Sequence, residues 1–206
     1  TPKSIAGLPA GNYILREIAA PDGYTVAADA KFTVERNVEN KVTMKDAPSK
    51  LTVSKKDLAG TTDLPGATFE VQDENGDVVT TIYKDRLEWT TSEKEPVKTI
   101  TGLKDGSYKL VETVAPVGYT IAAPISFTVK DGKFFRTIDK EAAEVDTITV
   151  KDQATELVIS KVDIADAEKE LPGAELQIMD AEGKTIVTTI YGVELKWTSG
   201  ETPKSI

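Results

Sequence analysis

The stretch that decides the fold is Glu112-Thr-Val-Ala-Pro116-Val-Gly118-Tyr119-Thr120, which recurs near the start of the chain as Glu17-Ile-Ala-Ala-Pro21-Asp-Gly23-Tyr24-Thr25. Each copy follows a run in which apolar residues occupy every second position, at 108 and 110 and at 13 and 15. A period of two predicts a β-strand, and the Pro-x-Gly sequence that follows predicts a turn. The chain is therefore predicted to contain a repeated unit built from strands and turns.

Further pairs of similar stretches show how the repeats are ordered. These pairs are Leu51–Lys55 with Leu157–Lys161, Leu64–Ala67 with Leu171–Ala174, Thr80–Tyr83 with Thr188–Tyr191, Trp89 with Trp197, and Val150–Asp152 with Met44–Asp46. Residues 49–153 carry each stretch once, residues 1–48 carry the later ones, and residues 154–206 carry the earlier ones. We therefore predict the C-terminal half of one domain at 1–48, a complete domain at 49–153 and the N-terminal half of another at 154–206.

The two ends of the chain share the sequence Thr-Pro-Lys-Ser-Ile, at residues 1–5 and 202–206. Overlaying these copies joins the tail to the head and gives a composite repeat. From its Trp to its Tyr this composite is two residues shorter than the complete repeat, whereas simple concatenation would make it three longer. The overlay fits better, and we expect a trimmed or engineered piece of a repetitive protein.

Short strands separated by regular turns predict an all-β fold, an antiparallel β-sandwich in tandem repeats. The linkers, at residues 47–49 and 153–155, are short, so neighbouring repeats are expected to form a stiff rod. Trp89 and Trp197 stand at equivalent places, which favours a packing role, and Tyr24 and Tyr119 are expected to fasten their turns against the sheet.

Composition excludes several classes of function. The chain has no His and no Cys, which excludes catalytic triads built on imidazole, thiol nucleophiles, zinc–thiolate sites and disulfides. An excess of 34 acidic over 25 basic residues argues against nucleic-acid binding, and no apolar run is long enough to span a membrane. We predict no cofactor and no metal.

The alternation also places ionisable residues on apolar strand faces. In the complete repeat these are Lys55, Glu112 and Asp152, and their counterparts in the two halves are Lys161, Glu17 and Asp46. Burial lowers the pKa of a lysine and raises that of a carboxyl group, so the pair can become a neutral amine facing a carboxylic acid. The amine can then attack the acid, a second carboxyl can carry the proton, and loss of water leaves an amide. The alternative is an unreacted buried salt bridge with a third carboxyl beside it.

These motifs resemble CnaB-type domains of Gram-positive surface adhesins and pilins. The resemblance implies a prealbumin-like, inverse immunoglobulin-like sandwich. It also implies isopeptide crosslinks Lys55–Asp152 and Lys161–Asp46, with Glu112 and Glu17 as the catalytic carboxyls. The Asp acceptor resembles the variant used in split tag-and-catcher ligation, in which water is lost, and residues 42–47 resemble such a tag strand.

We therefore expect a structural stalk or backbone module of a bacterial cell-surface protein, not an enzyme, because each crosslink forms in a single turnover. No signal peptide or sorting motif is seen within the sequence. A half sandwich leaves its core and strand edges open, so residues 154–206 of one chain are expected to pair head to tail with residues 1–48 of another, locked by Lys161 and Asp46. Alternatives are ring closure within one chain and a domain that binds a host ligand. A hydrolase built on Glu112 and Asp152 is disfavoured.

Overall fold

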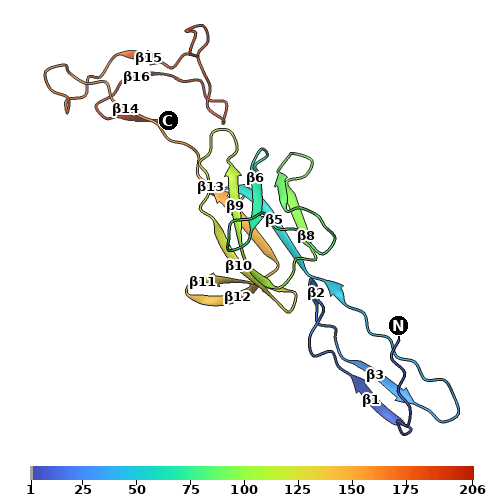
Figure 1. Cartoon of the computed structure of the whole chain (residues 1–206). Coiled ribbons are helices and arrows are strands. Elements are labelled where there is room, and N and C mark those ends of the chain that lie inside the picture. The colour runs from blue at the N-terminus through green and yellow to red at the C-terminus, as the bar shows by residue number, and fades with distance from the viewer. Residues whose placement is uncertain (1) are drawn as a thin grey trace.

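The structure is a computed structural model that describes residues 2–206, and it is built from strands without a helix in that range. The strands are β1 (Gly11–Leu15), β2 (Tyr24–Thr25), β3 (Ala30–Val34), β4 (Ala47–Pro48), β5 (Lys50–Asp57), β6 (Thr68–Gln72), β7 (Glu88–Thr90), β8 (Val97–Thr101), β9 (Gly106–Val114), β10 (Ile125–Lys130), β11 (Lys133–Ile138), β12 (Glu141–Val145), β13 (Thr147–Asp152), β14 (Val158–Ile159), β15 (Glu175–Gln177), β16 (Lys196–Thr198) and β17 (Lys204–Ser205). They form three bodies in a row, with the central body between an N-terminal and a C-terminal one (Figure 1). Among the described residues no helix is long and apolar enough to cross a membrane.

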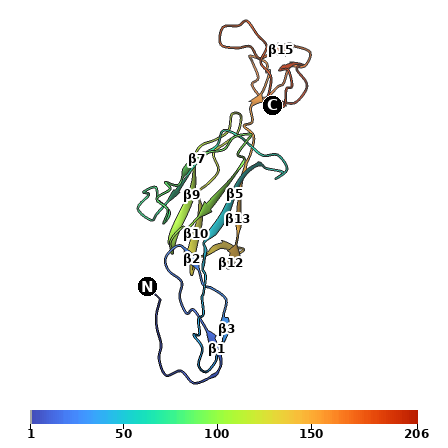
Figure 2. The same ribbon diagram turned by 90° about the vertical axis from the view of Figure 1, so that its right-hand side faces the viewer.

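The central body contains two sheets packed face to face. One has the strand order β12-β11-β10-β9-β6-β7 and the other the order β13-β5-β8. In Figure 2, β9 and β10 lie on one side of this body and β5 and β13 on the other. Fourteen buried apolar side chains from both sheets and their connections make one core, namely Leu51, Val53, Ala67, Phe69, Val71, Leu87, Ile100, Leu103, Leu110, Phe127, Val129, Phe134, Ile148 and Val150. The predicted all-β sandwich is confirmed.

One strand pair departs from the antiparallel pattern. The last strand of the central body, β13, runs parallel to its first strand, β5, with Val150 beside Lys55 and Asp152 beside Asp57. A parallel pair needs a crossover connection, and here the strands of the opposite sheet provide it. The period of two in the sequence is the same for either direction, so the sequence pattern does not distinguish them.

The N-terminal body is an open pair of strands, β1 and β3, with Tyr13 opposite Phe32. It lacks a counterpart of the β11–β12 hairpin, because residues 35–41 lead directly from β3 to the segment 42–46. That segment is not assigned as a strand, yet burial alternates along it: Val42, Met44 and Asp46 are half-buried and the residues between them are exposed.

The C-terminal body repeats the register of the central one. Val158 pairs with Ser205 as Thr52 pairs with Thr99, and Ile159 pairs with Lys204 as Val53 pairs with Lys98. The C-terminal copy of Thr-Pro-Lys-Ser-Ile, at residues 202–206, thus pairs with β14 in the same position that β8 takes beside β5. Residues 2–5 of the N-terminal copy are exposed and belong to no strand.

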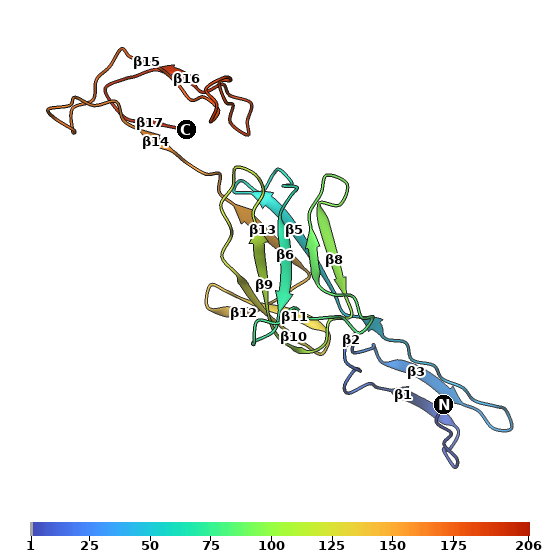
Figure 3. The same ribbon diagram turned by 45° about the horizontal axis from the view of Figure 1, so that its top comes forward.

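Both terminal bodies expose residues that are buried at the equivalent places of the central body. Leu157 is 53% exposed where Leu51 is 0% exposed, and Leu15 is 38% exposed where Leu110 is 2% exposed. The two bodies lie at opposite ends of the molecule and do not meet (Figure 3). Within one chain, each therefore keeps an open apolar face.

Candidate functional site

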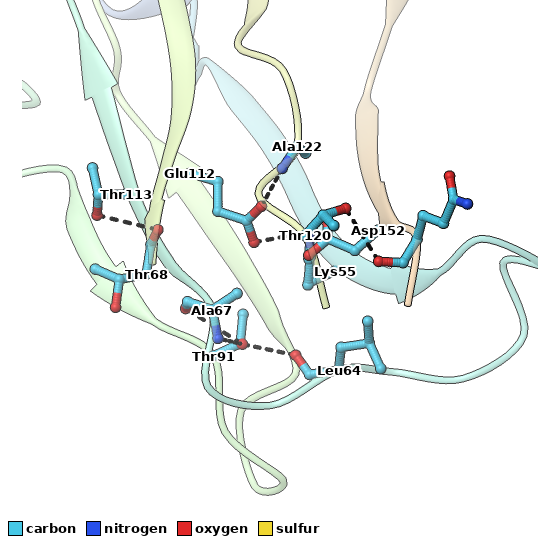
Figure 4. Close-up of polar contacts among 11 residues, drawn as sticks. Lys55, Leu64, Ala67, Thr68, Thr91, Glu112, Thr113, Thr120, Ala122 and Asp152 are labelled. Atoms are coloured by element: carbon cyan, nitrogen blue, oxygen red, sulfur yellow. Dashed lines mark hydrogen bonds and ion pairs between the residues drawn. The ribbon is translucent and has the colours of Figure 1, made fainter. Parts of the chain in front are cut away.

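Three buried charged side chains meet between the two sheets of the central body (Figure 4). Lys55 comes from β5 and Asp152 from the end of β13, in one sheet, and Glu112 comes from β9 in the other. Their exposed fractions are 0%, 1% and 5%, respectively. The predicted alternation accounts for this, because each residue continues the inward-facing positions of its strand, which are otherwise apolar.

The lysine lies between the two carboxyl groups. Lys55 Nζ is 2.9 Å from Glu112 Oε1 and also contacts Asp152 Oδ1. The other Glu112 oxygen, Oε2, accepts a hydrogen bond of 2.7 Å from the backbone N–H of Ala122, which fixes the orientation of the carboxyl group. The ring of Phe69 covers the amine, with its centroid 5.7 Å from Nζ.

These contacts are close but poorly directed. Lys55 Nζ, Glu112 Oε1 and both oxygens of Asp152 are buried and form no hydrogen bond of ordinary geometry with the described residues. The contact between Lys55 and Glu112 is therefore an ion pair by distance alone. Buried ions that lack full hydrogen bonding destabilise a folded protein by several kcal/mol.

Burial raises the pKa of Glu112. The Ala122 amide and Lys55 act in the opposite direction, whereas the Asp152 carboxylate adds to the increase. One ammonium between two carboxylates would leave a net negative charge in the core, and protonation of one carboxyl removes it. The site can therefore hold an exchangeable proton on Glu112, next to the amine.

The N-terminal body holds a second, partial copy of this site. Glu17 Oε2 accepts a hydrogen bond of 2.6 Å from the backbone N–H of Ala27, as Glu112 does from Ala122. Desolvation raises the pKa of Asp46, and the neighbouring Glu17 carboxyl group raises this pKa further. The structure thus brings Glu17 and Asp46 together.

Lys161 is not part of that pair within one chain. It lies in the C-terminal body, where its side chain is exposed and its backbone N–H donates a hydrogen bond of 3.1 Å to Glu170. The three predicted residues of the second site are therefore divided between the two ends of the molecule, two at one end and one at the other.

Other residues considered in the sequence have structural places. Trp89 stacks on Phe69 with ring centroids 5.5 Å apart, and Trp197 pairs with Leu176 in the same register. The packing role predicted for Trp89 is confirmed. Sequence reasoning missed the amides of Ala27 and Ala122, although a signal was present: each follows its glutamate by 10 residues.

Replacing Glu17 by Gln should lower the pKa of Asp46 toward its ordinary value, because the change removes the neighbouring negative charge while desolvation remains. The measurement is a carboxyl NMR titration in a Lys161→Ala background, in which the second crosslink cannot form. Glu39→Gln is the control, because Glu39 is exposed. An unchanged Asp46 pKa would show that the two carboxyl groups do not interact.

Comparison with solved structures finds several proteins to which the chain is similar. The chain is similar to the Bacillus anthracis TIE protein, with 29% identity over 97% of this chain and 34% of that one, at a TM-score of 0.48. It is similar to the group B streptococcus pilus 2b backbone protein, with 22% identity over 68% of this chain and 52% of that one, at a TM-score of 0.42. It is also similar to the shaft pilin SpaA from Lactobacillus rhamnosus GG, with 18% identity over 70% of this chain and 64% of that one, at a TM-score of 0.37.

The chain spans about a third of the length of the TIE protein. No curated protein matches it. The model of one protein family, SpaA, described as a prealbumin-like fold domain, matches residues 3–48 and, a second time, residues 49–142. The break between these matches coincides with the boundary that the internal repeat predicts. The chain therefore belongs to the SpaA prealbumin-like fold domain family.

Proposed function

We propose that this chain is a structural stalk module of a bacterial surface protein, stiffened by amide bonds that it forms by itself. The observation that carries the proposal is the complete burial of Lys55 between Glu112 and Asp152. An extracellular module without cysteine cannot form a disulfide, so any covalent crosslink that stabilises it must be of another kind. This cluster can supply such a crosslink.

The reaction joins Lys55 to Asp152. In the neutral form of the pair, Nζ of the amine attacks Cγ of the carboxylic acid. Protonated Glu112, whose Oε1 lies 2.9 Å from Nζ, gives its proton to the departing hydroxyl group and takes one from the amine. The products are one amide and one water, and Glu112 ends in its starting protonation state. Two buried ionisable groups are replaced by a neutral amide, which removes the cost of burying their charges.

The second crosslink would join Lys161 of one chain to Asp46 of another, with Glu17 in the role of Glu112. Three features support this pairing between chains. The terminal bodies expose their apolar faces, they lie at opposite ends of the molecule, and Glu17, which lies near Asp46, accepts the same kind of backbone hydrogen bond as Glu112. Their separation opposes ring closure within a single chain.

Intact mass spectrometry under denaturing conditions tests the central reaction. The mass should fall below the sequence value by one water for each amide formed, and proteolysis should release Lys55 and Asp152 in one branched peptide. The Lys55→Arg variant serves as a control, because it cannot form this amide and should therefore show no loss of water from this site. A wild-type chain of unreduced mass would overturn the proposal.

A further inference from the structure

The N-terminal and central bodies meet at a junction in which one isoleucine is enclosed by two glycines. Gly23, in the turn before β2, has φ +79°, and a Cβ there would lie 2.7 Å from Cγ2 of Ile82. Gly102, after β8, has φ +74°, and a Cβ there would lie 2.7 Å from Cγ1 of the same Ile82. Any side chain at either position would collide with Ile82, so the junction requires glycine on both sides.

Hydrogen bonds tie these parts together. The backbone N–H of Ser49 donates to Gly23 C=O at 2.8 Å, Gly102 N–H donates to Ser49 C=O at 2.9 Å, and Ile82 N–H donates to Gly102 C=O at 2.9 Å. The nearby Tyr24 phenol raises the pKa of the Tyr83 phenol, so the two tyrosines also lie close together across the junction. The junction therefore has three parts: a Gly-Tyr turn, an Ile-Tyr pair and a second glycine.

The junction between the central and C-terminal bodies repeats two of these parts. Gly118, with φ +81°, packs against Ile190, and Thr155 N–H donates to Gly118 C=O at 2.9 Å. Burial raises the pKa of Tyr119, and the nearby Tyr191 phenol raises it further. The second glycine is missing here, and Ile190 and Tyr191 remain 43% and 69% exposed. Within residues 2–206, the Ile190 amide and the Thr155 carbonyl form no hydrogen bond.

The counterpart of Gly102 in the composite repeat is Gly7, at the other end of the chain. Gly7 already has φ +80°, and a Cβ placed on it would have no atom within 4 Å. The next residue, Leu8, is 39% exposed, whereas its counterpart Leu103 is 1% exposed. Gly7, the counterpart of the glycine that the second junction lacks, is thus exposed and already has the matching backbone conformation.

We propose that Gly7 of a second copy of this chain packs over Ile190 and Tyr191 and completes the second junction. The Gly7 carbonyl accepts a hydrogen bond from Ile190, and its amide donates one to the Thr155 carbonyl. The inference rests on the proposed head-to-tail pairing and adds a docking contact to it. This contact sets the register of the incoming chain before Lys161 and Asp46 react.

Two full-length variants allow this contact to be tested. A chain with Asp46→Ala can supply only the Lys161 half, and a chain with Lys161→Ala can supply only the Asp46 half, so a mixture forms one covalent dimer. The readout is the initial rate of dimer formation on denaturing gels. Gly7→Asn in the Lys161→Ala chain should slow the reaction about tenfold or more, because its Cβ overlaps Ile190. Asparagine tolerates the left-handed conformation, so the free chain should fold normally.

Gly76→Asn in the same chain is the matched control. Gly76 also has a positive φ, +88°, and open space around it, but it lies in a turn of the central body. Ile190→Ala in the partner chain should reduce the penalty of Gly7→Asn, because it makes room for the new side chain. A Gly7→Asn rate equal to that of Gly76→Asn overturns this inference and leaves the pairing intact. If the parent mixture forms no dimer, both the pairing and this inference are wrong.

Discussion

Replacing Glu112 by Gln should leave the central domain folded but without its amide, and should lower its thermal unfolding temperature by an amount of order 20 °C. After correction for the change of side chain, the variant should be one water heavier than the wild type, because the wild type loses that water when the amide forms. Gln cannot carry the proton that the reaction needs. A crosslink between Lys55 and Asp152 closes almost the whole domain into one loop. In the chain-entropy model, a loop of about 100 residues is worth roughly 4.7 kcal/mol, which corresponds to a shift of this size in a small domain.

Glu144→Gln is the matched control for this experiment. Glu144 makes an exposed ion pair with Lys133, so the same chemical change there should alter the stability by about 0.5 kcal/mol or less and leave the mass deficit in place. Calorimetry and intact mass are measured on the same samples. A Glu112→Gln chain that still loses the water would remove Glu112 from the reaction. A chain that lacks the amide but melts at the wild-type temperature would remove the stabilising role of the crosslink.

Much of the central fold follows from local pattern in the sequence. Burial alternates along β9 and β13 as the period of two predicts, and this alternation is what directs Glu112 and Asp152 inward. The parallel direction of β13 against β5 depends on the path of the chain through the opposite sheet, and a local pattern carries no information about that path. The β11–β12 hairpin likewise has no counterpart in the N-terminal repeat from which it could be recognised.

The candidate site shows the same limit. The repeated motifs indicate Lys55 and its two carboxyl partners, because a charge on an apolar strand face is itself a local signal. The tyrosines after Pro-x-Gly are expected to fasten their turns against the sheet, but the sequence does not indicate that the phenols of Tyr24 and Tyr119 also lie close to those of Tyr83 and Tyr191 in the neighbouring body. Such contacts depend on how consecutive bodies are joined, which a comparison of repeats does not describe.

Replacing Asp46 by Ala should abolish every covalent multimer while leaving the amide of the central domain intact. The wild-type chain should give a ladder of bands that survives boiling on a denaturing gel, because each chain offers Lys161 at one end and Asp46 at the other. The Asp46→Ala chain should run as a monomer that has lost one water. Asp146→Ala, at an exposed position of the central domain, should keep the ladder. A wild-type monomer that has lost two waters would contradict the pairing between chains and show ring closure.

The mixture of the Asp46→Ala and Lys161→Ala chains separates these routes most sharply. Neither chain can close a ring or grow a polymer alone, since each lacks one reacting group. Together they should give one dimer band and nothing longer, because the joined product keeps only the two disabled ends. The dimer should have lost three waters, one from each central domain and one from the new bond. A dimer that has lost only two waters would be held by some other linkage, and the assignment of Lys161 and Asp46 would then be wrong. Growth beyond the dimer would mean that another lysine or carboxyl group can take the place of the one removed.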